Sequence, residues 1–261
     1  MTAVRSAASV TYAVWRALFL REAVFRLSGQ RIAWLWLLLE PVFHIAFIML
    51  LFELVRMATV PGADPAMFVM TGLLGFFTAR NTAFRSMEAI NANTALFAYR
   101  QVKPVDTVLV RAALEGFINL VVALIVLAGA GLLGIDLTVN DPLEVIVAFA
   151  GLWLCGLGLG LMLSVANQML AEVANIVKLL FLPLYFISGV MFPVLVVPQP
   201  YRDWLFLNPF LHGIEALRGG FFSHYYLVPE TSLSYLYGFA LVTIFFGLAL
   251  HVRYARKLIA L

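Results

Sequence analysis

Six stretches of about 20 or more mostly apolar residues constrain this chain more than any other feature. They cover residues 32–56, 66–90, 107–133, 143–167, 173–193 and 233–253. As a helix, each is long enough to cross the ~30 Å hydrocarbon core of a bilayer. Charged residues make up only 12% of the chain, and no repeat or long linker divides it. We therefore expect an all-α integral membrane protein with six transmembrane helices in one domain, residues 1–261.

The distribution of Lys and Arg indicates on which side of the membrane the termini lie. Most basic residues fall before the first stretch, around the connection between the second and third stretches, at the start of the fifth, and at the end of the chain. These residues are Arg5, Arg16, Arg21, Arg26, Arg31, Arg80, Arg85, Arg100, Lys103, Arg111, Lys178, Arg253, Arg256 and Lys257. Only Arg56, Arg202 and Arg218 fall on the opposite side. Because cytoplasmic loops carry the excess of positive charge, both termini are expected in the cytoplasm.

Residues 11–31, ahead of the first apolar stretch, are basic and rich in aromatic side chains. Such a segment favours a helix at the membrane interface, within a cytoplasmic region that covers residues 1–31. Its arginines recur every five residues, so they rotate around a helix and leave no clean polar face. We therefore expect this helix to contact protein as well as lipid.

Five prolines interrupt the apolar sequence between residues 182 and 219. They are Pro183, Pro193, Pro198, Pro200 and Pro209. Proline breaks a continuous helix, yet the apolar residues between the prolines require contact with lipid or protein. Residues 194–228 are therefore predicted to form a re-entrant segment of short helices on the periplasmic side. One of these helices is expected to begin with the cap Asn208 before Pro209 and to end at the Gly219-Gly220 pair.

The motifs of a membrane-embedded enzyme or a nucleotide-binding protein are missing. The four histidines are far apart in sequence and form no H-E-x-x-H motif, and no G-x-S-x-G motif occurs. No Gly-Lys dipeptide exists, which excludes a phosphate-binding P-loop. We therefore expect no catalytic residues, no bound metal and no bound cofactor. Any ATP-driven activity requires another chain to bind the nucleotide.

The connection between the second and third stretches is typical of a docking helix. Asn93 or Thr94 offers a cap, residues 95–102 form a short run, and Lys103-Pro104 ends it. The candidate contact residues are Leu96, Phe97, Tyr99, Arg100 and Lys103. Exposed apolar side chains with a nearby cation suit a groove on a soluble subunit. The alternative is a loop helix that lies on the membrane surface.

Ionisable residues inside apolar stretches are costly, so each is a candidate for a substrate pathway. Glu40 and His44 lie one turn apart in the first stretch, and Arg80 and Arg85 lie near the cytoplasmic end of the second. With neighbouring aromatic residues and Arg218, the candidate pathway residues are Glu40, Phe43, His44, Phe47, Arg80, Phe84, Arg85 and Arg218.

Each of these assignments has an alternative. For Arg80 it is an ion pair with Glu40 or Glu88, for the aromatic residues helix packing, and for Arg218 a local contact with Glu215. Elsewhere, Glu53, Glu115 and Asn119 are interpreted as bridges between helices.

Four segments of the chain resemble the ABC type-2 exporter permeases, and within them the capsular-polysaccharide export permeases of the KpsM type. The matching segments are L-W-L-L-L-E-P at 35–41, F-A-Y-R-Q-V-K-P at 97–104, L-P-L-Y-F-I-S-G-V-M-F-P at 182–193 and N-P-F-L-H-G-I-E-A-L-R-G at 208–219. The similarity extends over essentially the whole chain. By position, it implies that residues 96–100 couple to an ATPase, that residues 200–219 gate the exit, and that the basic segment before Ile32 is a cytoplasmic gate helix.

The resemblance also implies the assembly and its cargo. Two copies of this chain would join two copies of a cytoplasmic ABC ATPase that holds ATP and Mg. The complex would export lipid-linked anionic polysaccharide through the bacterial inner membrane, together with a periplasmic copolymerase and an outer-membrane export channel. No nucleic acid is involved. The alternatives are export of O-antigen or teichoic acid, export of a neutral glycan or drug, and an enzyme acting on a lipid-linked glycan with Glu40 and His44 as acid and base.

Overall fold

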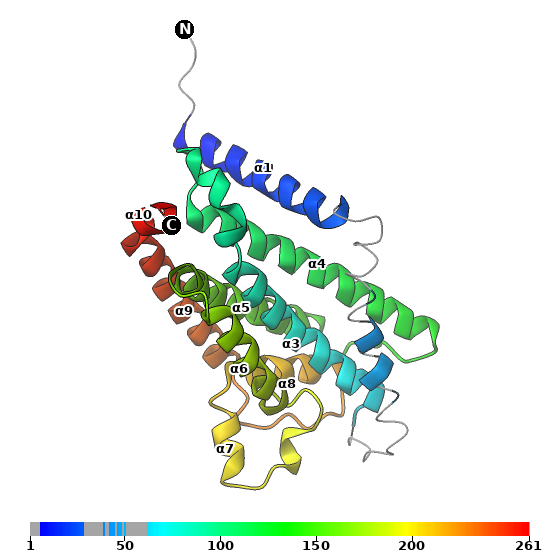
Figure 1. Cartoon of the computed structure of the whole chain (residues 1–261). Helices are drawn as coiled ribbons and strands as arrows, with labels where there is room; N and C mark the ends of the chain where they lie inside the picture. The colour runs from blue at the N-terminus through cyan, green and yellow to red at the C-terminus, as the bar shows by residue number, and fades with distance from the viewer. Residues whose placement is uncertain are drawn as a thin grey trace.

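The computed structural model describes residues 6–28 and 62–260, together with positions 39, 42–44, 46–48 and 50. All regular structure in these residues is helical (Figure 1). The elements are α1 (Ala7–Ser28), α3 (Pro65–Met87), η1 (Asn91–Ala98), α4 (Pro104–Leu132), α5 (Pro142–Met169), α6 (Val173–Ile187), η2 (Val194–Val196), α7 (Tyr201–Leu205), α8 (Pro209–Phe221), α9 (Leu233–Arg253) and α10 (Ala255–Ala260).

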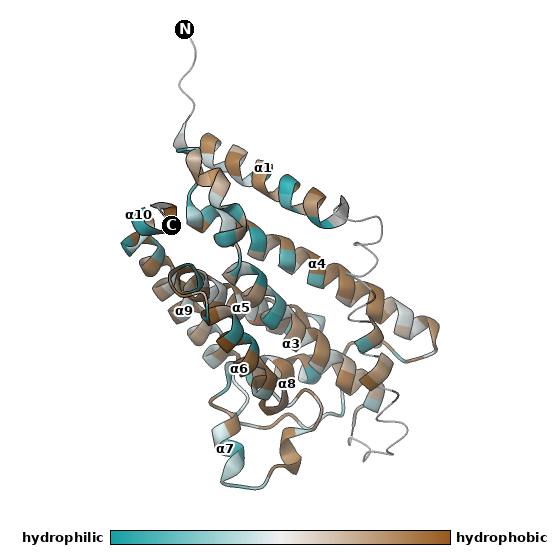
Figure 2. Ribbon diagram, viewed as in Figure 1, coloured by the Kyte–Doolittle hydropathy of each residue, from teal (hydrophilic) through white to brown (hydrophobic). Residues whose placement is uncertain are grey.

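Helix α5 is the centre of the bundle. It packs against α3 and α9 on its two sides and also contacts α8 and α4. Helix α1 lies alongside α4, at the end of the molecule that also carries α10, whereas α7 lies at the opposite end (Figure 1). Hydrophilic residues alternate with hydrophobic ones on α1, and others lie on α10, at the start of α4 and along α3 (Figure 2).

Three of the described helices are long and apolar enough to cross a membrane, namely α4, α5 and α9. They coincide with the predicted stretches 107–133, 143–167 and 233–253. The predicted stretch 66–90 corresponds to α3, which carries two arginines and is therefore less apolar. Most of the predicted stretch 32–56, including Glu40 and Glu53, lies outside the described residues. An all-helical membrane protein is thus confirmed in outline, and the crossing by six spans stays a prediction.

The fifth apolar stretch was expected to continue to residue 193, but α6 ends at Ile187. Pro183 lies inside α6 and does not end it. The chain turns at Gly189, whose φ of 67° is a conformation that favours glycine. Nδ2 of Asn208 donates to Oγ of Ser188 at 2.8 Å, which fixes the end of α6 against the start of α8.

The predicted re-entrant segment contains η2, α7 and α8. Helix α8 returns into the bundle and packs against α5, α3 and α9. The expected cap is confirmed, because Oδ1 of Asn208 accepts from the backbone N–H of Phe210 at 3.0 Å and Pro209 is the first helical residue. The expected stop at Gly219-Gly220 is wrong, since α8 continues to Phe221. Gly220 instead permits close packing on the start of α5, where a Cβ would lie 3.0 Å from the carbonyl oxygen of Asp141.

Glycines on α5 let both neighbouring helices approach closely. A Cβ on Gly156 would lie 2.5 Å from the carbonyl oxygen of Ala79 on α3. A Cβ on Gly158 would overlap Oγ1 of Thr243 on α9. The small-residue ridge predicted in this helix therefore serves packing, as close-approach interfaces between membrane helices do.

Substituting Gly156 tests this close packing. Gly156→Ala is expected to lower the free energy of unfolding by about 1–3 kcal/mol, because the added methyl meets a backbone oxygen that cannot move independently. The measurement is the melting temperature of the detergent-solubilised protein. The matched control is Gly129→Ala in α4, where a Cβ would meet no heavy atom within 4 Å. Equal melting temperatures for the two variants would contradict the packing argument.

Candidate functional site

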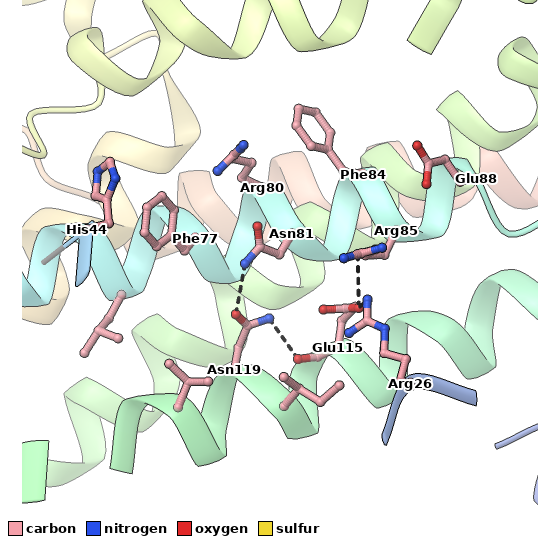
Figure 3. A pocket seen from close by; sticks show the side chains of 13 residues that line it. Arg26, His44, Phe77, Arg80, Asn81, Phe84, Arg85, Glu88, Glu115 and Asn119 are labelled. Atoms are coloured by element: carbon pink, nitrogen blue, oxygen red, sulfur yellow. Dashed lines mark hydrogen bonds and ion pairs between the residues drawn. The ribbon is translucent and has the colours of Figure 1, made fainter. Parts of the chain in front are cut away.

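A cavity of about 420 Å³ lies between α1, α3 and α4 and is closed on one side by His44 (Figure 3). We call it the arginine pocket, after three guanidinium groups in its wall. Its lining residues are Arg26, His44, Leu74, Phe77, Arg80, Asn81, Phe84, Arg85, Glu88, Glu115, Ile118, Asn119 and Val122. Four residues predicted for the substrate pathway meet here: His44, Arg80, Phe84 and Arg85.

Aromatic rings surround Arg80 in the arginine pocket. Its Cζ lies 5.2 Å from the ring centroid of Phe84 and 5.7 Å from that of Phe77. Both distances are within the range of a cation–π interaction. The His44 ring contacts Phe77 edge-on, with centroids 5.3 Å apart. One wall of the pocket therefore combines a positive charge with aromatic faces.

Glu115 joins three helices at the other wall of the pocket. Its carboxylate forms an ion pair with Arg26 of α1, and its Oε1 lies 3.9 Å from Nε of Arg85 on α3. One turn further along α4, Nδ2 of Asn119 donates to the Glu115 carbonyl oxygen at 2.8 Å. Nδ2 of Asn81 on α3 donates to Oδ1 of Asn119 at 3.4 Å. The predicted bridging role of Glu115 and Asn119 is confirmed (Figure 3).

Burial lowers the pKa of the Arg26 guanidinium, and the neighbouring Glu115 carboxylate opposes that shift. The ordinary pKa of arginine is so high that the group remains charged. A buried cation of this kind is costly unless an anion accompanies it. Arg26 therefore needs either Glu115 or another negative group beside it.

Three further polar contacts hold α1 in place. Nε1 of Trp15 donates to Oδ1 of Asp106 at 2.8 Å, and Nε of Arg111 donates to Oε1 of Glu22 at 2.6 Å. Arg21 also donates to the Asn93 side chain in η1. The expected contact of this basic helix with protein is thus confirmed.

Several apolar side chains of α1 are exposed, including Tyr12, Leu20, Val24 and Phe25, and the exposed Arg16 and Arg21 lie among them. This mixed aromatic and basic surface suits the membrane interface that the sequence predicts for the helix.

Other predicted pathway residues lie away from the arginine pocket. Phe43 and Phe47 are exposed and do not line it, and Glu40 lies outside the described residues. Arg218 is on α8, and its side chain is 0% exposed. In this structure Arg218 has no surface that a substrate can reach, so the local contact that the sequence offered as the alternative is what is observed.

Arg218 is the centre of a buried network at the α7 and α8 end of the molecule. Its Nη1 donates to Oε1 of Glu215 at 2.8 Å, and its Nη2 donates to the carbonyl oxygens of Val190 at 2.9 Å and Phe68 at 3.3 Å. Its Cζ lies 3.5 Å from the Phe68 ring centroid. The Tyr225 hydroxyl donates to Oε2 of Glu215 at 2.9 Å, and burial raises the pKa of that hydroxyl. The network ties α8 to α3 and to the turn after α6.

The connection predicted to contact an ATPase forms a 3₁₀ helix that starts earlier than expected. It covers Asn91–Ala98 instead of residues 95–102, because it follows almost directly on α3. Asn93 does not cap it but lies inside it, and its Nδ2 donates to the Ala89 carbonyl oxygen at 2.7 Å. The predicted end at Lys103-Pro104 is also wrong, since the 3₁₀ helix ends at Ala98, and Pro104 is instead the first residue of α4.

The five coupling candidates differ in exposure. The expected exposure of Phe97 is wrong: its side chain packs in a core cluster with Ile90, Val108 and Leu258 and is 7% exposed. Leu96 is half-buried. Tyr99, Arg100 and Lys103 are exposed and form the accessible part of this connection.

Arg26 and Phe77 line the arginine pocket although the sequence did not mark them as candidates. Phe77 lies one turn before Arg80 on α3, so the helical spacing around Arg80 would have found it. Arg26 meets a carboxylate 89 residues further along the chain, and no local pattern connects the two. The basic character of its segment was instead interpreted as a membrane-surface property.

The sequence model of the ABC-2 type transporter family matches residues 13–222. The chain is 35% identical over 247 residues to the polysialic acid transport protein KpsM of Escherichia coli, covering 95% of both chains. It is 28% identical over 243 residues to the capsule polysaccharide export inner-membrane protein CtrC of Neisseria meningitidis serogroup A, covering 92% of this chain and 90% of the relative. It is 27% identical over 237 residues to the capsule polysaccharide export inner-membrane protein BexB of Haemophilus influenzae, covering 91% and 89%. With its α-helical bundle and near full-length similarity to these proteins, the chain belongs to the ABC-2 type transporter family.

Proposed function

We propose that this chain is the permease subunit of an ATP-driven exporter that moves lipid-linked anionic capsular polysaccharide across the bacterial inner membrane, from cytoplasm to periplasm. The observation that carries the proposal is the 35% identity to KpsM over 95% of both chains. Similarity to CtrC and BexB, both named as capsule polysaccharide export proteins, supports the same function. The chain transports and does not itself catalyse a reaction.

The arginine pocket supports an anionic glycan as cargo. Guanidinium groups pair with carboxylates and phosphates through directed hydrogen bonds, and aromatic faces pack against apolar surfaces. The pocket offers three guanidinium groups with Phe77 and Phe84 beside them. Fixed charges around a narrow cavity attract an anion of opposite sign.

Membership of the family implies an ABC ATPase as partner. In the proposed assembly, two copies of this chain form a homodimer with two ATPase subunits, which hold ATP and Mg. A periplasmic copolymerase and an outer-membrane channel continue the route. Both termini face the cytoplasm, so that α1, α10 and the exposed residues Tyr99, Arg100 and Lys103 lie on the ATPase side. Helices α7 and α8 then lie on the exit side.

Deleting the chain from its host tests the proposed function. The expected result is loss of polysaccharide from the cell surface with its accumulation inside the cell, because synthesis continues without an export route. A plasmid copy of the chain restores surface polysaccharide only when the ATPase subunit can hydrolyse ATP. The measurement is immunodetection of polysaccharide on intact and on permeabilised cells. Unchanged surface polysaccharide in the deletion strain would contradict the proposal.

A further inference from the structure

We propose that Arg26 and Arg85 form an anion site in which Glu115 occupies the place of a phosphate or carboxylate group of the substrate, and that arrival of that group releases the end of α1 around Arg26 from α4. This inference deepens the proposed function and rests on it. It assigns to one ion-paired cluster both the recognition of the anion and the opening of the arginine pocket.

The first support is that the cluster contains more positive than negative side chains. One carboxylate, Glu115, is shared by two guanidinium groups that come from different helices, α1 and α3. The whole pocket is lined by three arginines and two glutamates, so with His44 neutral it carries one net positive charge. A cavity with excess positive charge and a shared internal anion favours a second anion.

The second support is access. The side chain of Arg85 is 52% exposed, whereas that of Glu115 is 4% exposed. An incoming anion therefore reaches Arg85 from the cavity without first displacing a buried group. At 3.9 Å, the Arg85–Glu115 contact is longer than a charge-assisted hydrogen bond, which is typically about 2.7–2.9 Å. A phosphate or carboxylate group in the cavity can approach Arg85 more closely and form a bidentate contact with its guanidinium group.

The third support is the position of Arg26. It lies in the last turn of α1 and holds that end of the helix to α4 through Glu115. Other polar contacts of α1, at Trp15, Arg21 and Glu22, precede Arg26 along the helix, with Glu22 one turn before it. When an anion replaces Glu115 as the ion-pair partner of Arg26, the end of α1 next to the first apolar stretch loses its ion pair with α4. The exposed aromatic and aliphatic side chains of α1 keep the helix at the membrane surface.

A distance measurement in the complete complex tests the inference. Spin labels are placed at Val24→Cys in α1 and Leu120→Cys in α4, both exposed positions, in a Cys155→Ala background. The complex with its ATPase is held in nanodiscs and titrated with dihexanoyl phosphatidic acid. The expected result is a growing population at longer label distance. The same response to uncharged dihexanoylglycerol, which lacks the phosphate group, would overturn the inference, because it would show an effect of the acyl chains alone.

Two further probes identify the source of the anionic group. A response to inorganic phosphate as well as phosphatidic acid supports a site for phosphate itself, and a response to phosphatidic acid alone supports a lipid headgroup. A response to oligomers of sialic acid alone supports a sugar carboxylate. Absence of a response to all three anions would overturn the inference.

Variants separate competition for the arginines from simple loosening of α1. Glu115→Gln removes the internal competitor, so the half-saturating anion concentration is expected to fall about tenfold. The matched control is Glu22→Gln, which breaks another ion pair between α1 and α4 outside the pocket. It is expected to leave the half-saturating concentration unchanged. An equal change in both variants, or none in Glu115→Gln, would overturn the inference.

Arg85→Gln is a second variant of the anion site. Because the Arg85 side chain is half-exposed, this substitution is expected to disturb folding less than a change at a buried residue. It is expected to raise the half-saturating anion concentration about tenfold. An unchanged concentration would overturn the anion site. Failure of this inference is distinguishable from failure of the proposed function. If the protein exports polysaccharide in host cells but α1 shows no anion-dependent movement, the inference alone is refuted.

Discussion

Arg218→Ala is expected to lower the free energy of unfolding by about 3–5 kcal/mol, the cost of removing one partner from a buried ion pair. The substitution leaves the Glu215 carboxylate in a 0% exposed position, where, among the residues that the structure describes, the Tyr225 hydroxyl is its remaining side-chain donor. It also removes the donors to Phe68 and Val190, which attach α8 to α3 and to the turn after α6. The measurement is the melting temperature of the purified protein together with its yield in membranes.

A double variant provides the control for Arg218. Replacing both members of the buried pair by apolar residues, as in Arg218→Met with Glu215→Leu, leaves no uncompensated charge. The melting temperature of the double variant is therefore expected to lie above that of Arg218→Ala. If Arg218→Ala instead keeps its stability and loses only export, Arg218 is a pathway residue and the structural interpretation of its network is wrong.

The positions and lengths of α4, α5 and α9 were predictable because apolar length alone determines them. The stretch 233–253 coincides with α9, and the stretches 107–133 and 143–167 lie within a few residues of α4 and α5. Asp64, Asp141 and Asn208 mark helix starts by a local rule, since each accepts a backbone N–H from the first turn of its helix.

The end of α6 and the limits of η1 depend on contacts that apolar length does not contain. Helix α6 stops where Ser188 meets Asn208, 20 residues away in sequence. Likewise, Phe97 is buried because α10 brings Leu258 to the same cluster. Hydropathy is equally compatible with an exposed or a buried Phe97, so only the tertiary arrangement decides between the two.

The residues that α3 contributes to the arginine pocket were predictable from local sequence spacing. Arg80, Phe84 and Arg85 lie on adjoining faces of one helix, and spacing along that helix brings them together. Other lining residues come from α1 and α4, which meet through contacts between residues far apart in sequence, such as the Arg26–Glu115 ion pair. Charge within an apolar stretch identified the candidates, but it did not identify which charges meet.

The proposed contact between this chain and its ATPase is the second place where changing a single charged residue, Arg100, is expected to have a large effect, in this case on export. Arg100 is exposed in the connection after η1, next to Tyr99, whose side chain is 67% exposed. Phe97 is buried among residues of α4, α5 and α10, so the same connection has an outer part for a partner and an inner part packed in the bundle. In the proposed coupling, a push on the outer part is transmitted to the helices through Phe97.

Arg100→Glu is expected to reduce export at least about tenfold, because reversing a charge at a protein interface introduces like-charge repulsion that costs several kcal/mol. The melting temperature is expected to stay unchanged, since an exposed side chain contributes little to packing. The measurement is surface polysaccharide, with the amount of ATPase that copurifies with the chain. Arg100→Lys keeps the positive charge and is expected to retain most of the export. Normal export by Arg100→Glu would show that the charge of Arg100 does not contribute to contact with the ATPase. Coupling would then have to involve Tyr99 or Lys103 instead.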